Sequence, residues 1–581
     1  MKLFQPYLKI IFIFLLVLII VDSNAQVLPI PNYPKGYFRW PLDIKPALAA
    51  NFGELRPNHY HMGLDCRTDQ KQNLRVSAAA DGYIAKVKIE PFGFGRSIYI
   101  NHPNGLTTLY AHLNEYNPEL EKYVTAEQYK QKSWKVFLDI PANLFPVTKG
   151  QFIAYSGSTG GSEGPHLHFE IRDTKTDKVL NPLLFGFDIT DNVAPDVLKL
   201  AMYDRSISVF EQSPKMFSVK KLNGVYVTIP PLLISNSNRV SFAITAFDRF
   251  TGSGNRNGIF EAILYDNEIP VVGFQLDSIS YDETRYLNAH IDYRLRSTGG
   301  PFVQHVSRLP GYPNGIYKII HGDGVIQLDD DSVHKIRIEV KDAYGNTSNV
   351  QFAVKRGPDV SKKIKPDLVS TVNQKIFYPG AINVFENDHI NATLPANCLY
   401  DTIHFRYNET NPKTGNAVYQ LHSPDVPVHA YFPVKIKASI PIDLRNKVVM
   451  QCYWNTKTDF AKAVPLTNWD EIGWYQASFR EFGNFQLLID TTAPNIAPVG
   501  FRDGMNCTKL NRIAFVVGDN TKEVKNFSAT LDGNWLRFTN DKARAFIYIF
   551  DDHCPPGQHE LKITATDQVG NIAEKVYHFT R

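Results

Sequence analysis

Two short phrases near the N-terminus combine histidine and aspartate at a spacing that suits zinc chemistry. Three residues separate His61 from Asp65, and one residue separates His166 from His168. A further histidine, His112, lies between the two phrases in a Tyr-Ala-His-Leu context. A catalytic zinc site usually has three protein ligands and one position for water, and imidazole nitrogen and carboxylate oxygen are suitable donors. We therefore predict three metal ligands here, with histidines left for acid–base chemistry.

The second phrase is typical of a β-strand. Residues 166–171 read His-Leu-His-Phe-Glu-Ile, an alternation that places His166 and His168 on the same face. Neighbours on one face of a strand are about 6.5–7 Å apart, so both can face one site while only one binds the metal. In the first phrase, Gly63 suits a turn that brings both flanking side chains to one ion.

Several competing patterns are set aside. The sequence has no HExxH phrase, which excludes a helix-borne zinc site of that type. His59 lies two residues before His61 but lacks the HxxxD spacing. The glycine-rich stretch 156–164 is not followed by Gly-Lys-Ser/Thr, so we interpret it as a flexible wall of the cleft and not as a phosphate cradle.

These blocks resemble the lysostaphin/LytM-type zinc metallopeptidases over about 51–182. The signature of that family is HxxxD, followed far downstream by HxH, with a YxHL phrase between them. The Asn-Phe-Gly-Glu-Leu-Arg-Pro block at 51–57 and the Ser-Gly-Ser-Thr-Gly block at 156–160 also fit the resemblance.

The resemblance implies an antiparallel β-sheet peptidase domain that uses Zn²⁺. Matched position by position, His61, Asp65 and His168 correspond to the zinc ligands, and His112 and His166 to the two catalytic histidines. The family implies hydrolysis of peptide bonds in peptidoglycan stems or cross-links.

One departure from the family pattern is an insertion at about 113–147, directly after His112. It is charged and rich in Tyr and Lys, and Thr125-Ala-Glu-Gln128 at its centre looks like a capping box, so we predict a short helix there. The insertion either lines, covers or blocks the groove, or is a passive surface excursion.

Bulk properties indicate several packed domains. The chain has 581 residues, of which 43% are hydrophobic and 21% charged. Lys plus Arg total 62 against 58 Asp plus Glu, a net charge of +4 that gives no case for nucleic acid. The aromatic share of 12% favours β-structure. The cysteines are too widely spaced for a disulfide scaffold or a CxxC zinc site.

The first residues have the features of an export signal. Lys2 and Lys9 precede an apolar run from Ile10 to Val21, and small residues follow up to Ala25. We predict a signal peptide at 1–25, with an uncleaved anchor as the alternative. A spanning helix needs about 20 apolar residues, and this run has about 12. We expect an exported protein, periplasmic, secreted or at the cell surface, with no membrane span after signal cleavage.

The chain changes character beyond the peptidase region, which we place at 26–187. An Asp-x-x-Ala-Pro phrase at 191–195 recurs at 490–494, and each is followed at a distance by alternating residues that end in Asp-x-x-Gly-Asn. The opening phrases resemble those of bacterial cell-surface immunoglobulin-like domains, and the Gly-Asn pairs suit tight turns. We predict an immunoglobulin-like β-sandwich with an insertion around 277–322 at 188–360, a β-rich domain at 361–488 and a second immunoglobulin-like β-sandwich at 489–581.

Together these features favour an exported zinc metalloendopeptidase that acts on peptidoglycan. One alternative is a non-catalytic wall-binding or activator protein that regulates other cell-wall hydrolases, and another is an adhesin-like protein that acts through its tail. The endopeptidase ranks first because all five positions of the signature are present. Peptidoglycan is the predicted partner, with a regulatory protein as a second partner through the insertion or the tail.

Overall fold

The computed structural model describes residues 27–313, 315–358, 375–411, 416–466, 473–543 and 545–581. The predicted signal peptide at 1–25 lies outside these residues. Met1–Asn32 and Tyr33–Arg581 are separate units, and the described residues 27–32 of the first contain no helix or strand. None of the described helices is long and apolar enough to cross a membrane.

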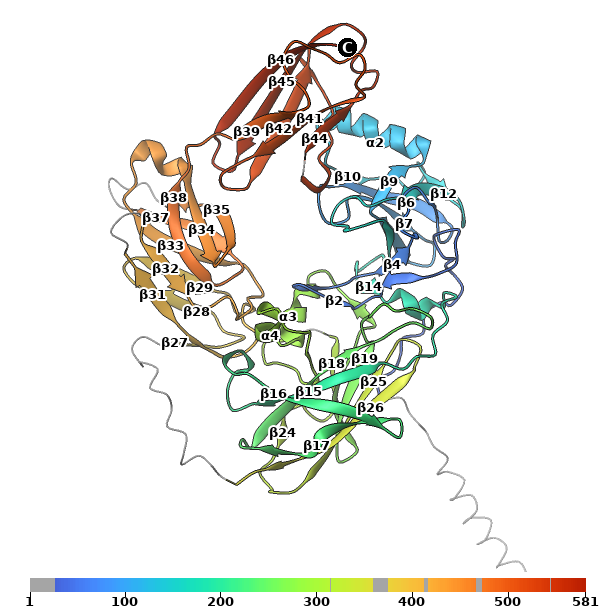
Figure 1. Cartoon of the computed structure of the whole chain (residues 1–581), viewed down its shortest axis with the longest axis vertical. Helices are drawn as coiled ribbons and strands as arrows, with labels where there is room; N and C mark the ends of the chain where they lie inside the picture. Colours follow the sequence, from blue (N-terminus) through green and yellow to red (C-terminus); the bar gives the residue numbers. More distant parts are fainter. Residues whose placement is uncertain (1–26, 314, 359–374, 412–415, 467–472, 544) are drawn as a thin grey trace, which may run out of the picture. The chain divides into compact units, whose positions relative to one another are not determined.

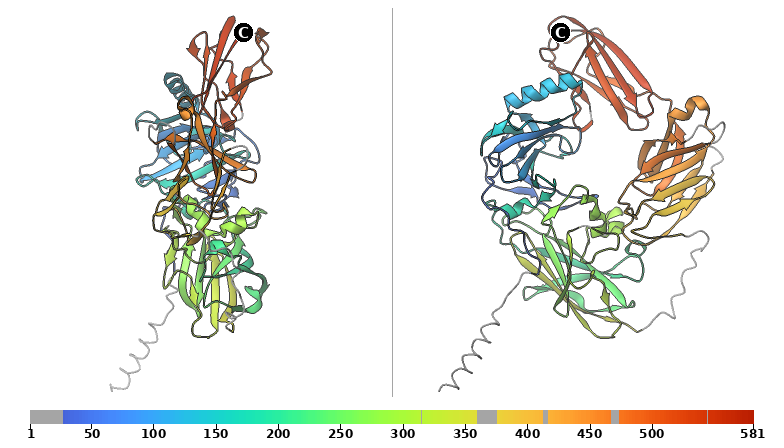
Figure 2. Two further views of the ribbon diagram at one scale, coloured as in Figure 1. Left: turned by 90° about the vertical axis from the view of Figure 1, so that its left-hand side faces the viewer. Right: turned by 180° about the vertical axis from the view of Figure 1, so that it is seen from behind.

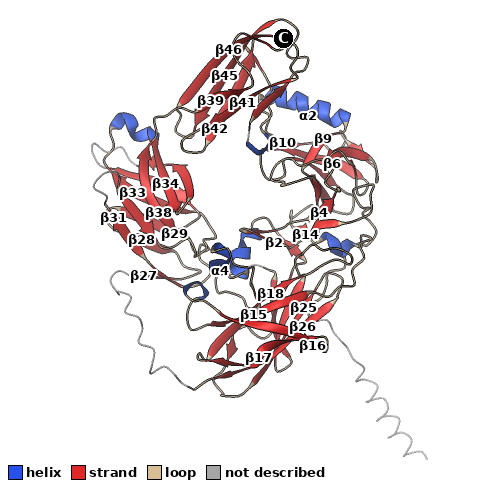
Figure 3. Cartoon of the chain, in the orientation of Figure 1, coloured by secondary structure: helices blue, strands red, loops and turns tan. Residues whose placement is uncertain are grey.

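The described chain is mainly β-structure, which confirms the predicted fold class (Figures 1 and 3). Strands account for 47% of the described residues and helices for 8%. Within the described ranges, the strand pairs are antiparallel except for β17 with β26 and β40 with β46.

The peptidase region has a ten-stranded sheet and a three-stranded sheet around one apolar core. The larger sheet runs in the order β1-β4-β13-β8-β7-β6-β10, and its central strands bury alternate apolar side chains such as Leu167, Phe169 and Ile171. The strands of the two sheets are β1 (Leu48–Ala50), β4 (Leu64–Arg67), β5 (Arg75–Ser77), β6 (Gly82–Ile89), β7 (Arg96–Asn101), β8 (Leu106–Ala111), β9 (Leu113–Tyr116), β10 (Val136–Asp139), β11 (Pro146–Val147), β12 (Phe152–Ser156), β13 (His166–Asp173), β14 (Val179–Leu180) and β21 (Ser278–Ile279).

The segment after His112 differs from the short helix predicted there. Its helix α2 spans Pro118–Gln131, and Asn117 caps it by accepting a hydrogen bond from the Leu120 amide. Thr125 lies inside the helix, so the predicted capping box is wrong. Leu120 is buried in the peptidase core, and β9, β10 and β11 pair with strands of the two sheets. Figure 2 shows α2 against these strands from two further sides.

The next region has one eleven-stranded sheet, in which the long strand β17 pairs with both β16 and β26. The elements here are β15 (Asp196–Asp204), η2 (Val209–Glu211), β16 (Lys215–Leu222), β17 (Val225–Ser235), β18 (Arg239–Phe247), β19 (Glu261–Asp266), β20 (Ile269–Gln275), η3 (Thr284–Tyr286), α3 (Leu287–His290), α4 (Tyr293–Ser297), β22 (Gln304–His305), β23 (Tyr317–Ile319), β24 (Ile326–Gln327), β25 (His334–Lys341) and β26 (Thr347–Arg356).

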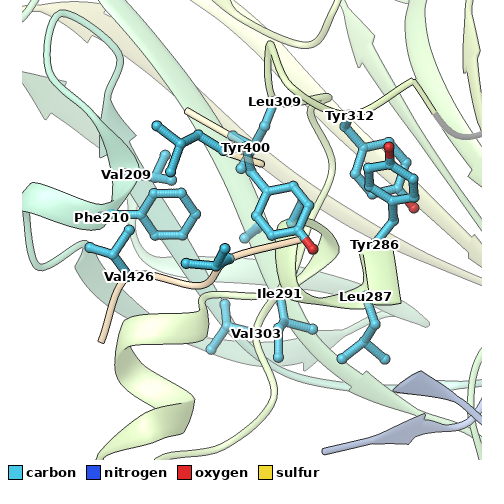
Figure 4. Packing of buried hydrophobic residues seen from close by; sticks show 14 of the residues in the cluster. Val209, Phe210, Tyr286, Leu287, Ile291, Val303, Leu309, Tyr312, Tyr400 and Val426 are labelled. Atoms are coloured by element: carbon cyan, nitrogen blue, oxygen red, sulfur yellow. The ribbon is translucent and has the colours of Figure 1, made fainter. Parts of the chain in front are cut away.

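The segment 277–322 of this region joins three parts of the chain. Its strand β21 pairs with β14 of the peptidase sheet. The ring of Tyr286 lies 5.1 Å from that of Tyr312 and 5.8 Å from that of Tyr400, which belongs to the third region. Figure 4 shows these side chains within one buried cluster. The segment therefore packs into the protein instead of forming a separate excursion.

The last two regions each have two main sheets. The third contains β27 (Lys375–Phe377), β28 (Asn383–Glu386), β29 (Ile390–Leu394), β30 (Ile403–Phe405), β31 (Tyr407–Thr410), β32 (Val418–Leu421), β33 (Phe432–Ala438), η4 (Ile442–Lys447), β34 (Val448–Trp454), β35 (Lys457–Lys462), β36 (Val464–Pro465), β37 (Gly473–Phe479) and β38 (Gly483–Ile489). The fourth contains β39 (Asn495–Val499), β40 (Met505–Asn506), β41 (Arg512–Gly518), β42 (Val524–Leu531), β43 (Asn534–Trp535), η5 (Asp541–Ala543), β44 (Phe546–Ile549), β45 (Gln558–Asp567) and β46 (Ile572–Thr580). The two sheets of the fourth region enclose one core, and its assignment as immunoglobulin-like stays a prediction.

Candidate active site

Three adjacent strands of the large peptidase sheet bring the predicted site residues together. Strand β13 lies between β4 and β8, so His168 pairs with Asp65 on one side and with Ala111 on the other. His112 follows Ala111 directly. Residues more than 100 positions apart in the sequence are therefore neighbours because of the strand register.

His61 reaches the same place from a short hairpin. Strands β2 (Leu55–Arg56) and β3 (His59–Tyr60) form it, and His61 comes directly after β3. The backbone of His61 is fixed by two hydrogen bonds, from the Gly53 amide to its carbonyl (2.8 Å) and from its own amide to the Glu54 carbonyl (2.8 Å).

Gly63 is required here for close packing. A Cβ atom at this position would lie 2.6 Å from the Phe169 carbonyl oxygen and 2.9 Å from the His168 ring. The predicted reason, backbone freedom in a turn, is therefore secondary to the space that the ring of His168 occupies.

The three predicted ligands present one atom each to a common point. His61 Nε2 lies 2.9 Å from Asp65 Oδ1 and 3.1 Å from His168 Nδ1, and the last two atoms are 3.0 Å apart. All three residues are buried. Two nitrogens and one carboxylate oxygen are donors that Zn²⁺ prefers, and bonds of about 2.1 Å to a tetrahedral ion would need edges of about 3.4 Å. The donor set fits Zn²⁺ with a small outward movement.

The other ring nitrogen of each ligand histidine is held by an acceptor. His61 Nδ1 donates to the Asn51 carbonyl oxygen at 2.7 Å, and His168 Nε2 donates to Glu170 Oε1 at 2.9 Å. Such partners fix the tautomer and orient the ring towards a metal. Both imidazoles therefore direct a lone pair at the same point.

His112 and His166 lie beside this group and are held in the same way. His112 Nδ1 donates to the Thr159 carbonyl oxygen (2.8 Å), and His166 Nδ1 to the Gly164 carbonyl oxygen (2.9 Å). Their ring centroids are 4.8 Å apart. His112 has a φ of +59°, a left-handed conformation that is unfavourable by about 1 kcal/mol or more for a residue with a side chain and is common at functional sites. Within the described residues neither Nε2 atom has a backbone partner, and His166 Nε2 lies 3.4 Å from Asp65 Oδ1.

The charge state of the group follows from burial and from these contacts. Burial lowers the pKa of His112 to about 3, with help from the neighbouring His168 and His166. Burial alone would raise the pKa of Asp65, but His61, His166 and His168 outweigh it and hold that pKa well below its usual range. His112 is therefore a neutral imidazole and Asp65 a carboxylate near neutral pH.

Comparison with known proteins agrees with this geometry. Residues 59–129 and 145–182 match the family model described as Peptidase family M23. The chain contains an M23 peptidase domain. A second match, to a Zu5-like domain, covers residues 374–490 and so most of the third region.

The relatives of the M23 domain match only part of this chain. An "uncharacterized metalloprotease" of Haemophilus influenzae is 32% identical over 158 residues, which are 26% of this chain and 27% of that protein. The DD-carboxypeptidase/endopeptidase Mpg of Neisseria meningitidis serogroup B is 30% identical over 169 residues, 29% of this chain and 31% of that protein. The solved catalytic domain of lysostaphin from Staphylococcus simulans is 24% identical, with a TM-score of 0.18, over 24% of this chain and 90% of that one. The chain thus spans less than a third of the length of either curated relative.

The M23 domain has a charged layer behind the ligands that the sequence interpretation missed. Glu170 accepts from His168 and, through its other oxygen, from Arg172 Nε at 2.7 Å. Tyr281, from the segment that pairs with β14, donates to Glu170 Oε1 at 2.5 Å. The pKa of the buried Glu170 falls to about 2, because Arg172 and His168 outweigh the effect of burial. Positions 166, 168, 170 and 172 alternate along one strand, so Glu170 and Arg172 could have been found from the sequence. Tyr281 carries no local signal.

His59 stays outside the site of the M23 domain. It is exposed, and its Nδ1 atom lies 2.9 Å from the Pro57 carbonyl oxygen. The HxxxD spacing therefore selected the histidine that the structure places beside Asp65.

The glycine-rich stretch of the M23 domain contacts both the site and the fourth region. Its Thr159 and Gly164 carbonyls hold His112 and His166, as described above. On its other side, the Gly160 amide donates to Asp541 Oδ1 at 2.7 Å, and Lys542 Nζ donates to the Ser162 carbonyl. The stretch therefore borders the site on one side and is held by a distant part of the chain on the other, while its predicted flexibility stays a prediction.

Proposed function

We propose that this protein is an exported zinc metalloendopeptidase that hydrolyses peptide bonds in peptidoglycan stems or cross-links. The observation that carries the proposal is the triangle of His61 Nε2, Asp65 Oδ1 and His168 Nδ1, with edges of 2.9–3.1 Å, beside two oriented histidines. The M23 match supports the peptidase chemistry. Relatives named DD-carboxypeptidase/endopeptidase and cell division protein DipM support a cell-wall substrate and a location in the cell envelope.

In this proposal His61, Asp65 and His168 hold Zn²⁺. When bound, Zn²⁺ would supply Lewis acidity, which polarises a carbonyl group and lowers the pKa of water towards neutrality. Glu170 keeps the His168 ring oriented, and the Asn51 carbonyl does the same for His61. No covalent intermediate is needed, and so no serine or cysteine nucleophile is required.

His112 and His166 are the proposed acid–base pair. Each donates its Nδ1 proton to a backbone carbonyl, which leaves Nε2 as the acceptor on the site side. One imidazole takes the proton of the attacking water, and the pair then stabilises the oxyanion and returns a proton to the leaving amine. The low pKa of His112 keeps its imidazole neutral at physiological pH.

The test compares the wild-type protein with His61→Ala and His166→Ala. Each purified chain is assayed for bound zinc and for release of peptide fragments from purified sacculi. We expect one zinc ion and release of fragments for wild type, no zinc for His61→Ala, and zinc without hydrolysis for His166→Ala. Equal digestion by all three proteins would refute the site assignment. Zinc binding by wild type without cleavage of any wall preparation would favour a wall-binding or activator protein instead.

A further inference from the structure

Two trios of aspartates outside the M23 domain bring their carboxylates together. Within each trio, one oxygen per residue lies within 4.8 Å of the others. One trio belongs to the second region and one to the fourth, and they consist of Asp191, Asp248 and Asp342, and of Asp490, Asp519 and Asp567.

The trios occupy equivalent places in their two regions. The first aspartate lies five residues before a strand begins, β15 in one case and β39 in the other. The second follows the last residue of β18 or of β41. The third, in the Asp-x-x-Gly-Asn phrase, comes directly after the penultimate strand β25 in one region and is the last residue of the penultimate strand β45 in the other. The same arrangement is thus present twice in one chain.

In the second region, a turn fixes one aspartate of the trio. Asp342 Oδ1 accepts from the amides of Tyr344 (2.8 Å) and Asn346 (2.9 Å). The Asn346 side-chain amide donates to Asp342 Oδ2 (2.6 Å) and to the backbone carbonyl of Asp191 (3.3 Å). The segment that enters the region is therefore tied to the hairpin that closes it.

The fourth region repeats these contacts. Asp567 Oδ1 accepts from the amides of Val569 (2.9 Å) and Asn571 (2.8 Å). The Asn571 side-chain amide donates to Asp567 Oδ2 (2.7 Å) and to the backbone carbonyl of Asp490 (3.0 Å). In both regions, amides of the closing turn therefore fix the carboxylate of the third aspartate, Asp342 or Asp567, without a contact from the other two aspartates.

Several carboxylate oxygens of the trios have no hydrogen-bond donor among the described residues. Asp191 Oδ2, Asp248 Oδ1 and Asp490 Oδ2 are buried and unpartnered, and these residues are only 7%, 2% and 2% exposed. Across the described ranges, no Lys, Arg or His forms an ion pair with any of the six aspartates. A buried acceptor without a partner is destabilising, and so is a buried charge without a counter-ion.

The pKa shifts of the first trio also indicate carboxylates that lack a counter-ion. Burial, together with the neighbouring Asp342 and Asp191, raises the pKa of Asp248 to about 8. Burial also raises the pKa values of Asp191 and Asp342. A cation among these oxygens would remove the repulsion and satisfy the free acceptors at once. A site made only of oxygen donors suits Ca²⁺ and does not suit Zn²⁺, which prefers nitrogen or sulfur ligands.

We propose that each trio binds one Ca²⁺ ion. The ion ties the segment that enters a β-region to the strand end and the hairpin against which that segment packs. The two sites therefore stiffen the junction that follows the M23 domain and the junction before the fourth region. This role is independent of peptide hydrolysis at the zinc site.

The first experiment uses the full chain stripped of metals with EDTA and then dialysed against calcium. We expect two bound Ca²⁺ ions per chain at about 2 mM calcium, and a rise of about 5 °C or more in the unfolding temperature. No calcium uptake at this concentration would overturn the proposal. An equal rise with Mg²⁺ in place of Ca²⁺ would overturn the choice of ion.

The second experiment uses Asp248→Asn and Asp519→Asn, which each remove one charge from one trio. Each variant should bind one Ca²⁺ ion instead of two, and the double variant none. In EDTA, Asp248→Asn should be at least as stable as wild type because repulsion is relieved. Asp330→Asn and Asp503→Asn are matched controls, since both aspartates are exposed in the same two regions, and both should retain two ions. Two ions bound by the double variant would contradict the assignment.

Discussion

The candidate metal-binding clusters in the described part of the chain are of two kinds, and the contrast shows what separates a site for chemistry from a site for structure. The His61, Asp65 and His168 group mixes nitrogen and oxygen donors, with Asp65 and His168 on neighbouring strands of one sheet and His61 directly after a hairpin. The aspartate trios use oxygen alone and draw it from the ends of strands and from turns.

The surroundings differ as much as the donors. Behind His168 lies a chain of charged contacts through Glu170 to Arg172, and in front lie two histidines whose Nδ1 atoms are held by backbone carbonyls. Around the trios there are backbone amides of turns and no basic group within ion-pair distance in the described structure. A catalytic metal site needs acid–base groups that do not bind the metal, whereas a structural metal site needs only that its own ligands be fixed.

The largest expected effect comes from removing a ligand of the first kind. His61→Ala should abolish zinc binding and lower the rate of sacculus digestion on the order of a thousandfold or more, because the Lewis acid is lost. The number of bound Ca²⁺ ions should stay at two. Zinc and calcium content are measured by mass spectrometry on the same sample.

The matched control for this change is His59→Ala. His59 is two residues away and exposed, and it lies outside the group. Its variant should keep both zinc and activity. Loss of zinc in His59→Ala would show that the zinc group is assigned wrongly. Loss of calcium in His61→Ala would show that the zinc group and the aspartate trios are not independent.

The next largest effect is expected at His112 and His166, the proposed acid–base histidines. His112→Gln and His166→Gln should each keep one zinc ion and lower the rate on the order of a hundredfold, the usual scale of general acid–base catalysis. Zinc content and the rate constant for hydrolysis are measured together. If either variant loses zinc, that histidine belongs among the ligands, and the division of roles between His166 and His168 is wrong.

A smaller effect is expected behind the ligands. Tyr281→Phe removes the hydrogen bond to Glu170 Oε1 but keeps the ring. We expect zinc affinity to fall about tenfold, the lower end of the range for such partners, because His168 is held less firmly. Competition with a chromogenic chelator measures this affinity. Tyr378→Phe is the control, since Tyr378 is 52% exposed and lies in the third region. The zinc affinity of this variant should match that of wild type. Unchanged affinity in Tyr281→Phe would show that Glu170 needs only Arg172.

The sequence predicted the first kind of cluster far better than the second. The HxxxD spacing selected His61 and Asp65, and strand alternation placed His166 and His168 on one face. The resemblance to LytM-type peptidases then assigned the ligand role to His168. The repeated Asp-x-x-Ala-Pro and Asp-x-x-Gly-Asn phrases were identified as the beginnings and ends of β-regions. Asp248 and Asp519 have no phrase around them, so the trios could be recognised only once the sheets placed three strand ends together.

Tyr281 and the start of α2 were also not predicted from the sequence, because tertiary contacts determine both. Tyr281 is 111 residues from Glu170, and only the pairing of β14 with β21 brings them together. The start of α2 was misplaced because Thr125 matched a capping pattern, whereas Asn117 followed by a proline is the start that the structure uses. Local patterns predicted that elements exist, and tertiary packing decided which of their residues matter.

The smallest expected effect tests whether the two parts of the comparison are linked. Lys542 and Asp541, in the region of the second trio, hold the glycine-rich wall whose carbonyls orient His112 and His166. Lys542→Ala should free this wall and raise the rate of sacculus digestion about two- to fivefold, because substrate enters a less confined site. Lys509→Ala, an exposed lysine of the same region, should leave the rate unchanged. A lower rate in Lys542→Ala would mean that the contact supports the catalytic histidines instead of restricting access to them. Either way, zinc content should not change, because neither residue contacts a ligand of the metal.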